Sequence, residues 1–197
     1  MHPIMEQSFA VIDSEIGTHN FTPCEYAIIP RIIHSTADFE FLDLVKFSPE
    51  AIASGIDALR RRVPIVTDVS MVKQGIVSLV GQTFDNQIIS AVEQVKSPLP
   101  GKTRTETGLM QCYQQYPEAI YAIGNAPTAL LALCKQVESA SISPALVIGA
   151  PVGFISVLES KAALANTPVN QIRIEGRKGG SSVAAAIVNA LIVLAQA

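Results

Sequence analysis

The sequence has few charged residues and no excess of basic ones. Lys, Arg, Asp and Glu together make up 16% of the 197 residues, and the formal net charge is −3. Because proteins that bind nucleic acids or anionic membranes in general are basic, this balance argues against both partners. Hydrophobic residues reach 49%, which excludes a disordered chain. A surface with so few charges favours an oligomer with an apolar interface.

Cysteine is scarce and membrane signals are missing. The three cysteines, Cys24, Cys112 and Cys134, form no C-x-x-C pair, so neither a disulfide framework nor a zinc site is expected. The first residues lack the basic-then-apolar pattern of a signal peptide. The most apolar stretch, 183–195, is shorter than a bilayer span and contains Asn189. We therefore expect a cytoplasmic protein without a membrane partner.

The familiar cofactor and hydrolase motifs are also missing. There is neither a G-x-G-x-x-G nor a G-x-x-x-x-G-K-[ST] motif, which disfavours a dinucleotide cofactor and ATP. There is no G-x-S-x-G elbow and no H-E-x-x-H helix. Asp38, Glu40 and Asp43 cluster in sequence, and this spacing is more typical of a solvated turn than of paired catalytic carboxylates.

What the sequence does contain is a repeated strand–helix unit. Residues 121–127 (YAIGNAP) and 146–151 (LVIGAP) each combine a short β-branched run, Ile-Gly and a proline, and their glycines lie 25 residues apart. A weaker third copy, 172–174 (IRI), leads to Gly176. This spacing predicts successive strand–helix units of a parallel sheet. Between the first two units, one helical face is predicted from the spacing of Leu130, Leu133, Cys134 and Val137.

The remaining segments fit the same plan. A final helix is expected from about Ser181, buried all round because Ala and Val flank its apolar stripe of Val183, Ile187, Leu191 and Leu194. Ser48 and Pro49 are typical of the cap and first position of another helix. Strands are expected at 42–47, at 64–68 and at 86–92, and a loop at 96–102. The prediction is one α/β domain over residues 1–197, doubly wound, with a mainly parallel sheet and helices on both faces.

Ligands of open parallel sheets bind beyond the carboxyl ends of the strands. The loops expected there are 68–71, 124–128, 149–153 and 176–181. In the last of these, Arg177 and Lys178 precede two glycines and a helix start, which is a pattern suited to holding an anion. A solvated basic turn capped by Ser181 fits the same pattern equally well.

Among the three histidines, His34 is the candidate for chemistry. His2 lies at the terminus and His19 lies in a polar loop, whereas His34 stands at the apparent end of a helix that starts near Thr22. Imidazole titrates near neutral pH, so His34 would make a competent general acid or base. A capping role at the helix end is the alternative. Arg104 is similarly either an anion clamp or a surface arginine.

Several motifs together resemble the precorrin-8X methylmutase family and its cobalt-pathway counterpart, the cobalt-precorrin-8 methylmutases. The resemblance runs in order along nearly the whole chain, although 93–101 is less typical. The matching segments are Ser8-Phe9, 31–39 (RIIHSTADF), 68–71 (DVSM), Thr103-Arg104, 124–130 (GNAPTAL), 147–154 (VIGAPVGF), 159–161 (ESK), 176–181 (GRKGGS) and 184–191 (AAAIVNAL).

The resemblance implies a step of corrin-ring synthesis for vitamin B12. A methyl group moves from C-11 to C-12 of precorrin-8X or cobalt-precorrin-8, which gives hydrogenobyrinate or its cobalt form. This isomerisation needs no cofactor and no protein-bound metal. The resemblance also implies a homodimer, a corrinoid tetrapyrrole as substrate, and His34 as the catalytic residue. The candidate substrate-binding residues are Ser8, Arg31, Thr103, Arg104, Asn125, Thr128, Arg177, Lys178, Gly179 and Gly180.

Two other classes of protein remain open at this point. The chain could hold or deliver a corrinoid without converting it, in which case His34 would be structural. It could also be a nucleotide-dependent transferase on the same fold, and the missing phosphate motifs count against that reading.

Overall fold

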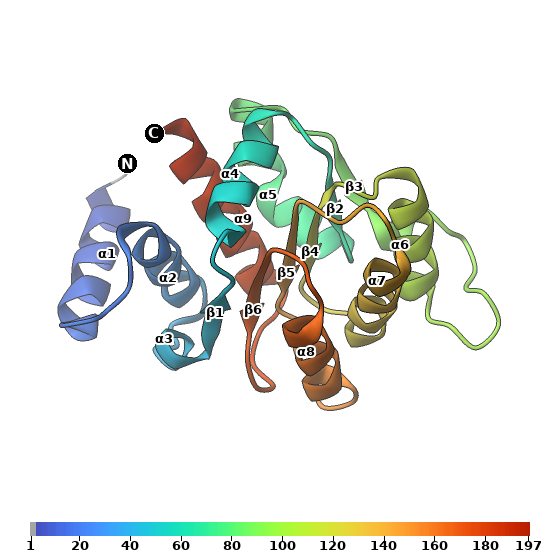
Figure 1. Cartoon of the computed structure of the whole chain (residues 1–197). Helices are drawn as coiled ribbons and strands as arrows, with labels where there is room; N and C mark the ends of the chain where they lie inside the picture. The colour runs from blue at the N-terminus through green and yellow to red at the C-terminus, as the bar shows by residue number, and fades with distance from the viewer. Residues whose placement is uncertain (1–2) are drawn as a thin grey trace.

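A computed structural model describes residues 3–197 and is built around a six-stranded sheet (Figure 1). The strands lie in the order β1-β6-β5-β4-β2-β3. β1 is antiparallel to β6, and all other neighbours are parallel. The predicted mainly parallel sheet is therefore confirmed. The strands are β1 (Val45–Phe47), β2 (Ile65–Thr67), β3 (Ile88–Ser90), β4 (Ile120–Ile123), β5 (Leu146–Gly149) and β6 (Gln171–Ile174).

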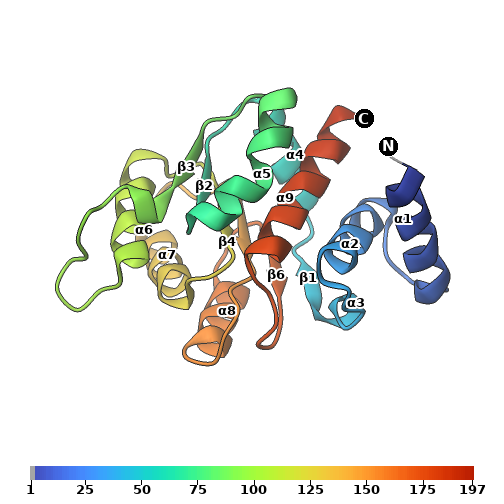
Figure 2. The same ribbon diagram turned by 180° about the vertical axis from the view of Figure 1, so that it is seen from behind.

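The helices cover both faces of this sheet, as expected for a doubly wound fold. They are α1 (Pro3–Ile16), α2 (Pro23–Thr36), α3 (Phe41–Leu44), α4 (Ala51–Arg60), α5 (Ser70–Gln82), α6 (Arg104–Gln115), α7 (Pro127–Ser139), α8 (Val157–Asn166) and α9 (Ser181–Gln196), with a 3₁₀ turn η1 (Ala91–Glu93). α9 and α5 lie on one face, which Figure 2 shows in front, and α7 and α8 lie on the other (Figures 1 and 2). α2 packs on the outer side of α9.

Alternating side chains of the central strands supply two separate cores. In β4, Ile120 and Ala122 join the cluster that contains α2, α4, α5 and α9, whereas Tyr121 and Ile123 join the cluster of α6, α7 and α8. Successive residues of a strand point to opposite faces, so a strand buried on both sides is apolar throughout. This is why the Ile-Gly runs of the repeated units predicted buried parallel strands correctly.

The last helix is less completely buried than the sequence suggested. Val183, Ile187 and Leu191 are fully buried, but Ser182 and Val193 are exposed. The helices α2, α4 and α5 surround only part of the circumference of α9, and one stripe is left uncovered. The expectation of burial on all sides was therefore wrong for this stripe.

Three local predictions in the first half also need correction. α4 begins at Ala51 with Glu50 at its cap, because Ser48 instead continues the pairing of β1 with β6: its N–H donates to Gln171 O at 2.9 Å. The strand expected at 42–47 starts only at Val45, after the short helix α3. The strand expected at 86–92 covers only 88–90 and ends in η1. The strand expected at 64–68 and the loop at 96–102 are present.

Within residues 3–197, no helix is long and apolar enough to cross a bilayer.

Candidate active site

A buried carboxylate organises the centre of the carboxyl edge of the sheet. Asp68 follows β2 and is fully buried, and four backbone N–H groups donate to it. Oδ1 accepts from Val69 at 2.9 Å and from Gly124 at 3.0 Å, and Oδ2 accepts from Asn125 at 2.7 Å and from Ala126 at 2.8 Å. Burial raises the pKa of the Asp68 carboxyl, and the four N–H donors act against that rise.

Asp68 and its four N–H donors, the Asp68 clamp, lie at the switch point of the sheet, between β2 and β4. This is where α/β folds commonly bind ligands. Here, however, the edge is closed by packing. A Cβ on Gly124 would lie 2.8 Å from the Cα of Ser181 at the start of α9. The loop after β4 therefore packs directly against α9. Sequence reasoning placed this loop at the edge but missed the role of Asp68, whose only signal is an acidic residue that directly follows a buried strand.

His34 lies in the last turn of α2, as predicted, and its side chain is exposed. The helix begins at Pro23, beside the predicted start near Thr22, and a capping box formed by Thr22 and Glu25 closes this end. Its other end is closed without the histidine. Ala37 N–H donates to Ile33 O at 2.7 Å, and the hydroxyls of Ser35 and Thr36 each donate to Ile32 O at 2.9 Å. The imidazole is thus not used as the helix cap.

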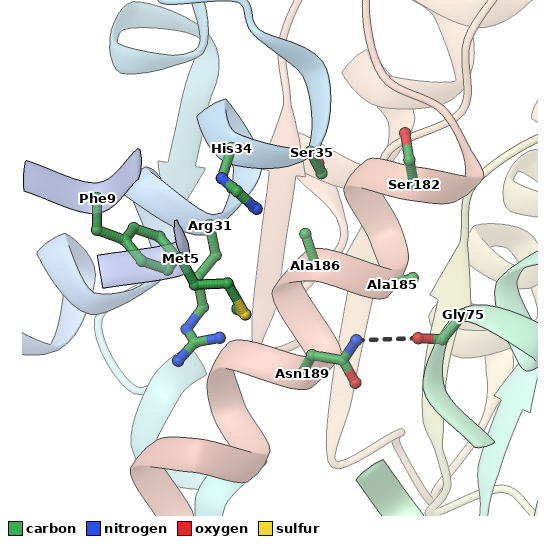
Figure 3. Close-up of a pocket in the computed structure, with 10 residues that line it drawn as sticks. All are labelled: Met5, Phe9, Arg31, His34, Ser35, Gly75, Ser182, Ala185, Ala186 and Asn189. Carbon is green, nitrogen blue, oxygen red and sulfur yellow. Dashed lines mark hydrogen bonds between the residues drawn. The ribbon is translucent and has the colours of Figure 1, made fainter. Parts of the chain in front are cut away.

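The imidazole of His34 lies where two cavities adjoin. One cavity, of about 260 Å³, lies between α1, α2 and α9, and Arg31, Ser182 and Asn189 help to line it (Figure 3). The other, of about 420 Å³, is lined largely by apolar side chains of α1 and α2 and also by Ser8. The structure therefore places Ser8, Arg31 and His34 together. The ring of Phe9 lies 5.1 Å from that of His34, centroid to centroid.

Arg31 is a half-buried cation without a carboxylate partner among residues 3–197. Its guanidinium carbon lies 5.7 Å from the ring centroid of Phe9. Burial lowers the pKa of Arg31, yet a guanidinium remains charged in proteins. Arg177 has a similar arrangement, with its guanidinium carbon 5.9 Å from the ring centroid of Phe154. Both arginines are thus free to meet an acidic ligand.

Lys178, in contrast, is already paired. Its Nζ lies 2.6 Å from Asp38 Oδ2 and 2.9 Å from Glu40 Oε1. The pairing lowers the pKa of Asp38 and raises that of Lys178. Asp38 and Glu40 thus lie in a partly exposed turn, as expected, and the sequence did not reveal that both pair with Lys178. These residues join the turn after α2 to the loop after β6.

Of the two glycines that follow Lys178, the first is required by close packing and the second by its φ of +125°. Gly179 has a φ of +153°, and a Cβ there would clash with the carbonyl oxygen of Ala150. The N–H of Gly180 donates to the same oxygen at 2.8 Å. Both glycines thus hold the loop 176–180 against the loop after β5, which keeps Arg177 at the surface.

The other predicted site residues lie away from His34. Thr103 caps α6, and its hydroxyl lies 3.1 Å from that of Thr128. Arg104 Nε donates to Val92 O at 2.9 Å, and Asn125 is exposed beside α7. Figure 1 places α6 and α7 toward one end of the sheet and α1 and α2 toward the other. The structure therefore separates this group from Ser8, Arg31 and His34.

A family model described as precorrin-8X methylmutase matches residues 3–194. The chain belongs to this family. The cobalt-precorrin-8 methylmutase of Synechocystis sp. is 56% identical over 98% of this chain and 96% of its own length. The precorrin-8X methylmutase of Sinorhizobium sp. is 34% identical over 95% of this chain and 92% of its own length.

The fold agrees with this assignment. A structure titled as a precorrin-8X methylmutase of Thermus thermophilus superposes with a TM-score of 0.90 at 38% identity, and covers 99% of this chain and 98% of that one. The family expected from the motifs is thus confirmed. So are the isomerase class, the methyl shift and the place in cobalamin biosynthesis.

His19, Cys112 and Cys134 of this methylmutase do not line either cavity beside His34. His19 stacks on Tyr26, with ring centroids 4.0 Å apart, and His2 lies outside the described residues. Cys112 and Cys134 are buried, and burial raises the pKa of Cys112 to about 11. Within residues 3–197, no three His, Cys, Asp or Glu side chains gather as a metal site.

Proposed function

We propose that this methylmutase acts on cobalt-precorrin-8, moves the methyl group from C-11 to C-12, and uses His34 as its proton donor. The observation that carries the proposal is an exposed imidazole between two cavities, beside an arginine with no carboxylate partner among residues 3–197. The 56% identity to a protein named cobalt-precorrin-8 methylmutase favours the cobalt form of the substrate.

The substrate carries several acetate and propionate groups around a partly apolar ring. A charge-assisted hydrogen bond from a guanidinium to a carboxylate is among the strong polar contacts, so Arg31 and Arg177 are the best-suited anchors. Phe9, Met5 and Ala186 offer apolar contact beside His34. Cobalt in the ring belongs to the substrate, so the protein needs no ligand set for it.

The chemistry asked of the protein is modest. The bond from the methyl group to C-11 breaks and the bond to C-12 forms within one molecule, so no electron acceptor or second substrate enters. His34 donates a proton, or a strong hydrogen bond, to the ring-C region as its electron distribution changes, and recovers the proton afterwards. The arginines contribute fixed positive charge that holds the carboxylate arms.

We further propose that Ser8 binds substrate beside His34, and that the group around Thr103, Arg104, Asn125 and Thr128 meets at most the distal arms of the ring. Gly179 and Gly180 contribute by shaping the loop that carries Arg177. We also propose that the protein acts in the cytoplasm as a homodimer. Exposed apolar side chains on two helices support the dimer: Met5 and Val11 on α1 and Val193 on α9.

Turnover of two substrates tests the proposal directly. The purified protein is incubated with cobalt-precorrin-8 and, separately, with metal-free precorrin-8X, and each conversion is followed by absorbance. We expect faster conversion of the cobalt form. A complex that forms without any isomer would identify a carrier instead, and faster conversion of the metal-free form would overturn the substrate assignment.

A further inference from the structure

Lys161 is a buried cation outside the cavities that His34 lines. It lies on α8, and only 4% of its surface is exposed. Its ammonium group donates to Gly176 O at 2.7 Å and to Lys178 O at 2.6 Å. No carboxylate pairs with it among residues 3–197. A buried charge that meets only backbone carbonyls is expensive, because its desolvation is not offset by an opposite charge.

The two carbonyls belong to the loop that carries Arg177. Because Lys161 draws the carbonyls on either side of Arg177 toward α8, the loop has little freedom to turn over. Gly176 has a φ of +69°, so the backbone bends sharply at the first of these contacts. The neighbouring acid, Glu175, pairs with Arg173 at 3.3 Å rather than with Lys161.

The contacts of Lys161 continue to the helix of His34. Lys178 receives the hydrogen bond of Lys161 on its carbonyl and binds Asp38 with its own ammonium group. Asp38 lies four residues after His34, directly beyond the end of α2. One connected set of polar contacts thus runs from α8, through the loop after β6, to the turn that ends the helix of His34.

We propose that Lys161 is a positioning residue for the methyl shift, which fixes the end of α2 and therefore the imidazole of His34 through Lys178 and Asp38. The inference rests on the proposed function of His34. It gives a role to a buried lysine at a position where an apolar residue of similar length would fill the same space. Burial lowers its pKa to about 8, which agrees with the absence of a paired acid.

Steady-state kinetics of three variants test the chain of contacts. Lys161→Met removes the charge and keeps most of the volume, Asp38→Asn removes the negative charge from the pair with Lys178, and the double variant combines them. We expect each single variant to lose about 10- to 100-fold in kcat, because small displacements of a catalytic group have effects of this size. The double variant is expected to lose no more than the worse single variant, since both act through the same contacts.

The matched control is Lys73→Met, which removes a partly exposed lysine paired with Glu93 and is expected to keep its kcat. Urea unfolding at pH 7 verifies that each variant is folded. A folded Lys161→Met enzyme with normal kcat, a change confined to KM, or additive losses in the double variant would each overturn the proposal.

A second measurement does not depend on turnover. The imidazole resonances of His34 are assigned by their loss in His34→Ala and compared between variants by NMR. We expect them to shift in Lys161→Met and in Asp38→Asn, but not in Lys73→Met. Unchanged resonances in a folded Lys161→Met protein would refute the positioning role. An inactive wild-type protein would refute the proposed function and leave this comparison valid.

Discussion

The carboxylate of Asp68 accepts a hydrogen bond of 3.0 Å from the backbone N–H of Gly124, which lies 56 residues further along the chain. This contact joins the ends of β2 and β4 where the direction of the sheet order reverses. Because Asp68 is fully buried, no water can replace it as the acceptor for the loop after β4.

Asp68→Asn is therefore expected to destabilise the protein strongly. The new amide group turns at least one N–H toward backbone N–H donors and leaves buried groups without a partner. We expect the free energy of unfolding in urea to fall by on the order of 3 kcal/mol. The control is Asp57→Asn, which loses only an exposed pair with Arg61 and should change it by less than about 1 kcal/mol. A loss of equal size in both variants would contradict the clamp.

His34→Ala is expected to reduce turnover by about 10²–10⁴-fold, which is the usual contribution of general acid catalysis. Binding of the pigment should be nearly unchanged, because the arginines and apolar side chains remain. His34→Asn, which can donate a hydrogen bond but cannot titrate, should recover part of the rate without its pH dependence. His19→Ala, which removes ring contacts with Tyr26 and Phe21 away from the cavities of His34, is the control. Normal turnover by His34→Ala would leave the reaction without its acid.

The basic residues should contribute unequally to substrate affinity. Arg31 and Arg177 have no carboxylate partner among residues 3–197, whereas Lys178 is paired with Asp38 and Arg104 uses its Nε on Val92. Arg31→Ala and Arg177→Ala should each weaken binding by about 1.5–3 kcal/mol, and Arg104→Ala by less. Titration calorimetry at two salt concentrations measures both the loss and its screening. Equal losses at all three positions would contradict this ranking.

Lys161 should give stability a distinct dependence on pH. Below pH 8 Lys161 is charged in both the folded and the unfolded protein, and the folded protein bears the full penalty of burying the charge. Between pH 8 and pH 10.5, which is the ordinary pKa of lysine, the folded state loses the proton that the unfolded state keeps. The free energy of unfolding therefore rises with pH. Relative to Lys161→Met, the wild type should gain on the order of 2 to 3 kcal/mol between pH 7 and pH 10. A difference in the free energy of unfolding between wild type and Lys161→Met that stays constant over this range would refute the lowered pKa of Lys161.

The proposed dimer is tested by light scattering. At micromolar concentration we expect the mass of two chains, because the exposed stripe of α9 and the apolar side chains of α1 would be covered in the assembly. Val193→Asp places a charge on this stripe and should shift the mass toward one chain. A monomer mass for the wild type would refute the dimer.

The fold could be predicted largely because its signals are local. The repeated units, in which Ile-Gly is followed shortly by a proline, mark the ends of β4 and β5. Thr22 and Glu25 mark the start of α2 within four residues. The predictions failed where the structure of a residue depends on a partner far away in the sequence. Ser48 is typical of a helix cap, yet it pairs with Gln171, 123 residues away, and so becomes part of the sheet.

The same distinction holds for the candidate site: residues in local motifs could be predicted, and contacts between distant segments could not. His34, Arg31 and Ser8 could be named from their motifs, and the structure brings them together. The pairing of Lys178 with Asp38 spans 140 residues, so the sequence could not reveal that this lysine is already neutralised. Nor could it reveal that Arg104 lies far from His34, because the order of strands in the sheet decides that separation.

The position of α9 has a consequence for synthesis on the ribosome. α2, α4 and α5 all pack against α9, which is translated after all three of them. Their apolar sides therefore have no permanent cover while the nascent chain is still growing. Exposed apolar surface of this kind makes incomplete chains prone to aggregation and attracts chaperones. The cavity that α2 lines with Arg31 and His34 is thus completed only when α9, a helix of 16 residues that is made later, docks beside it.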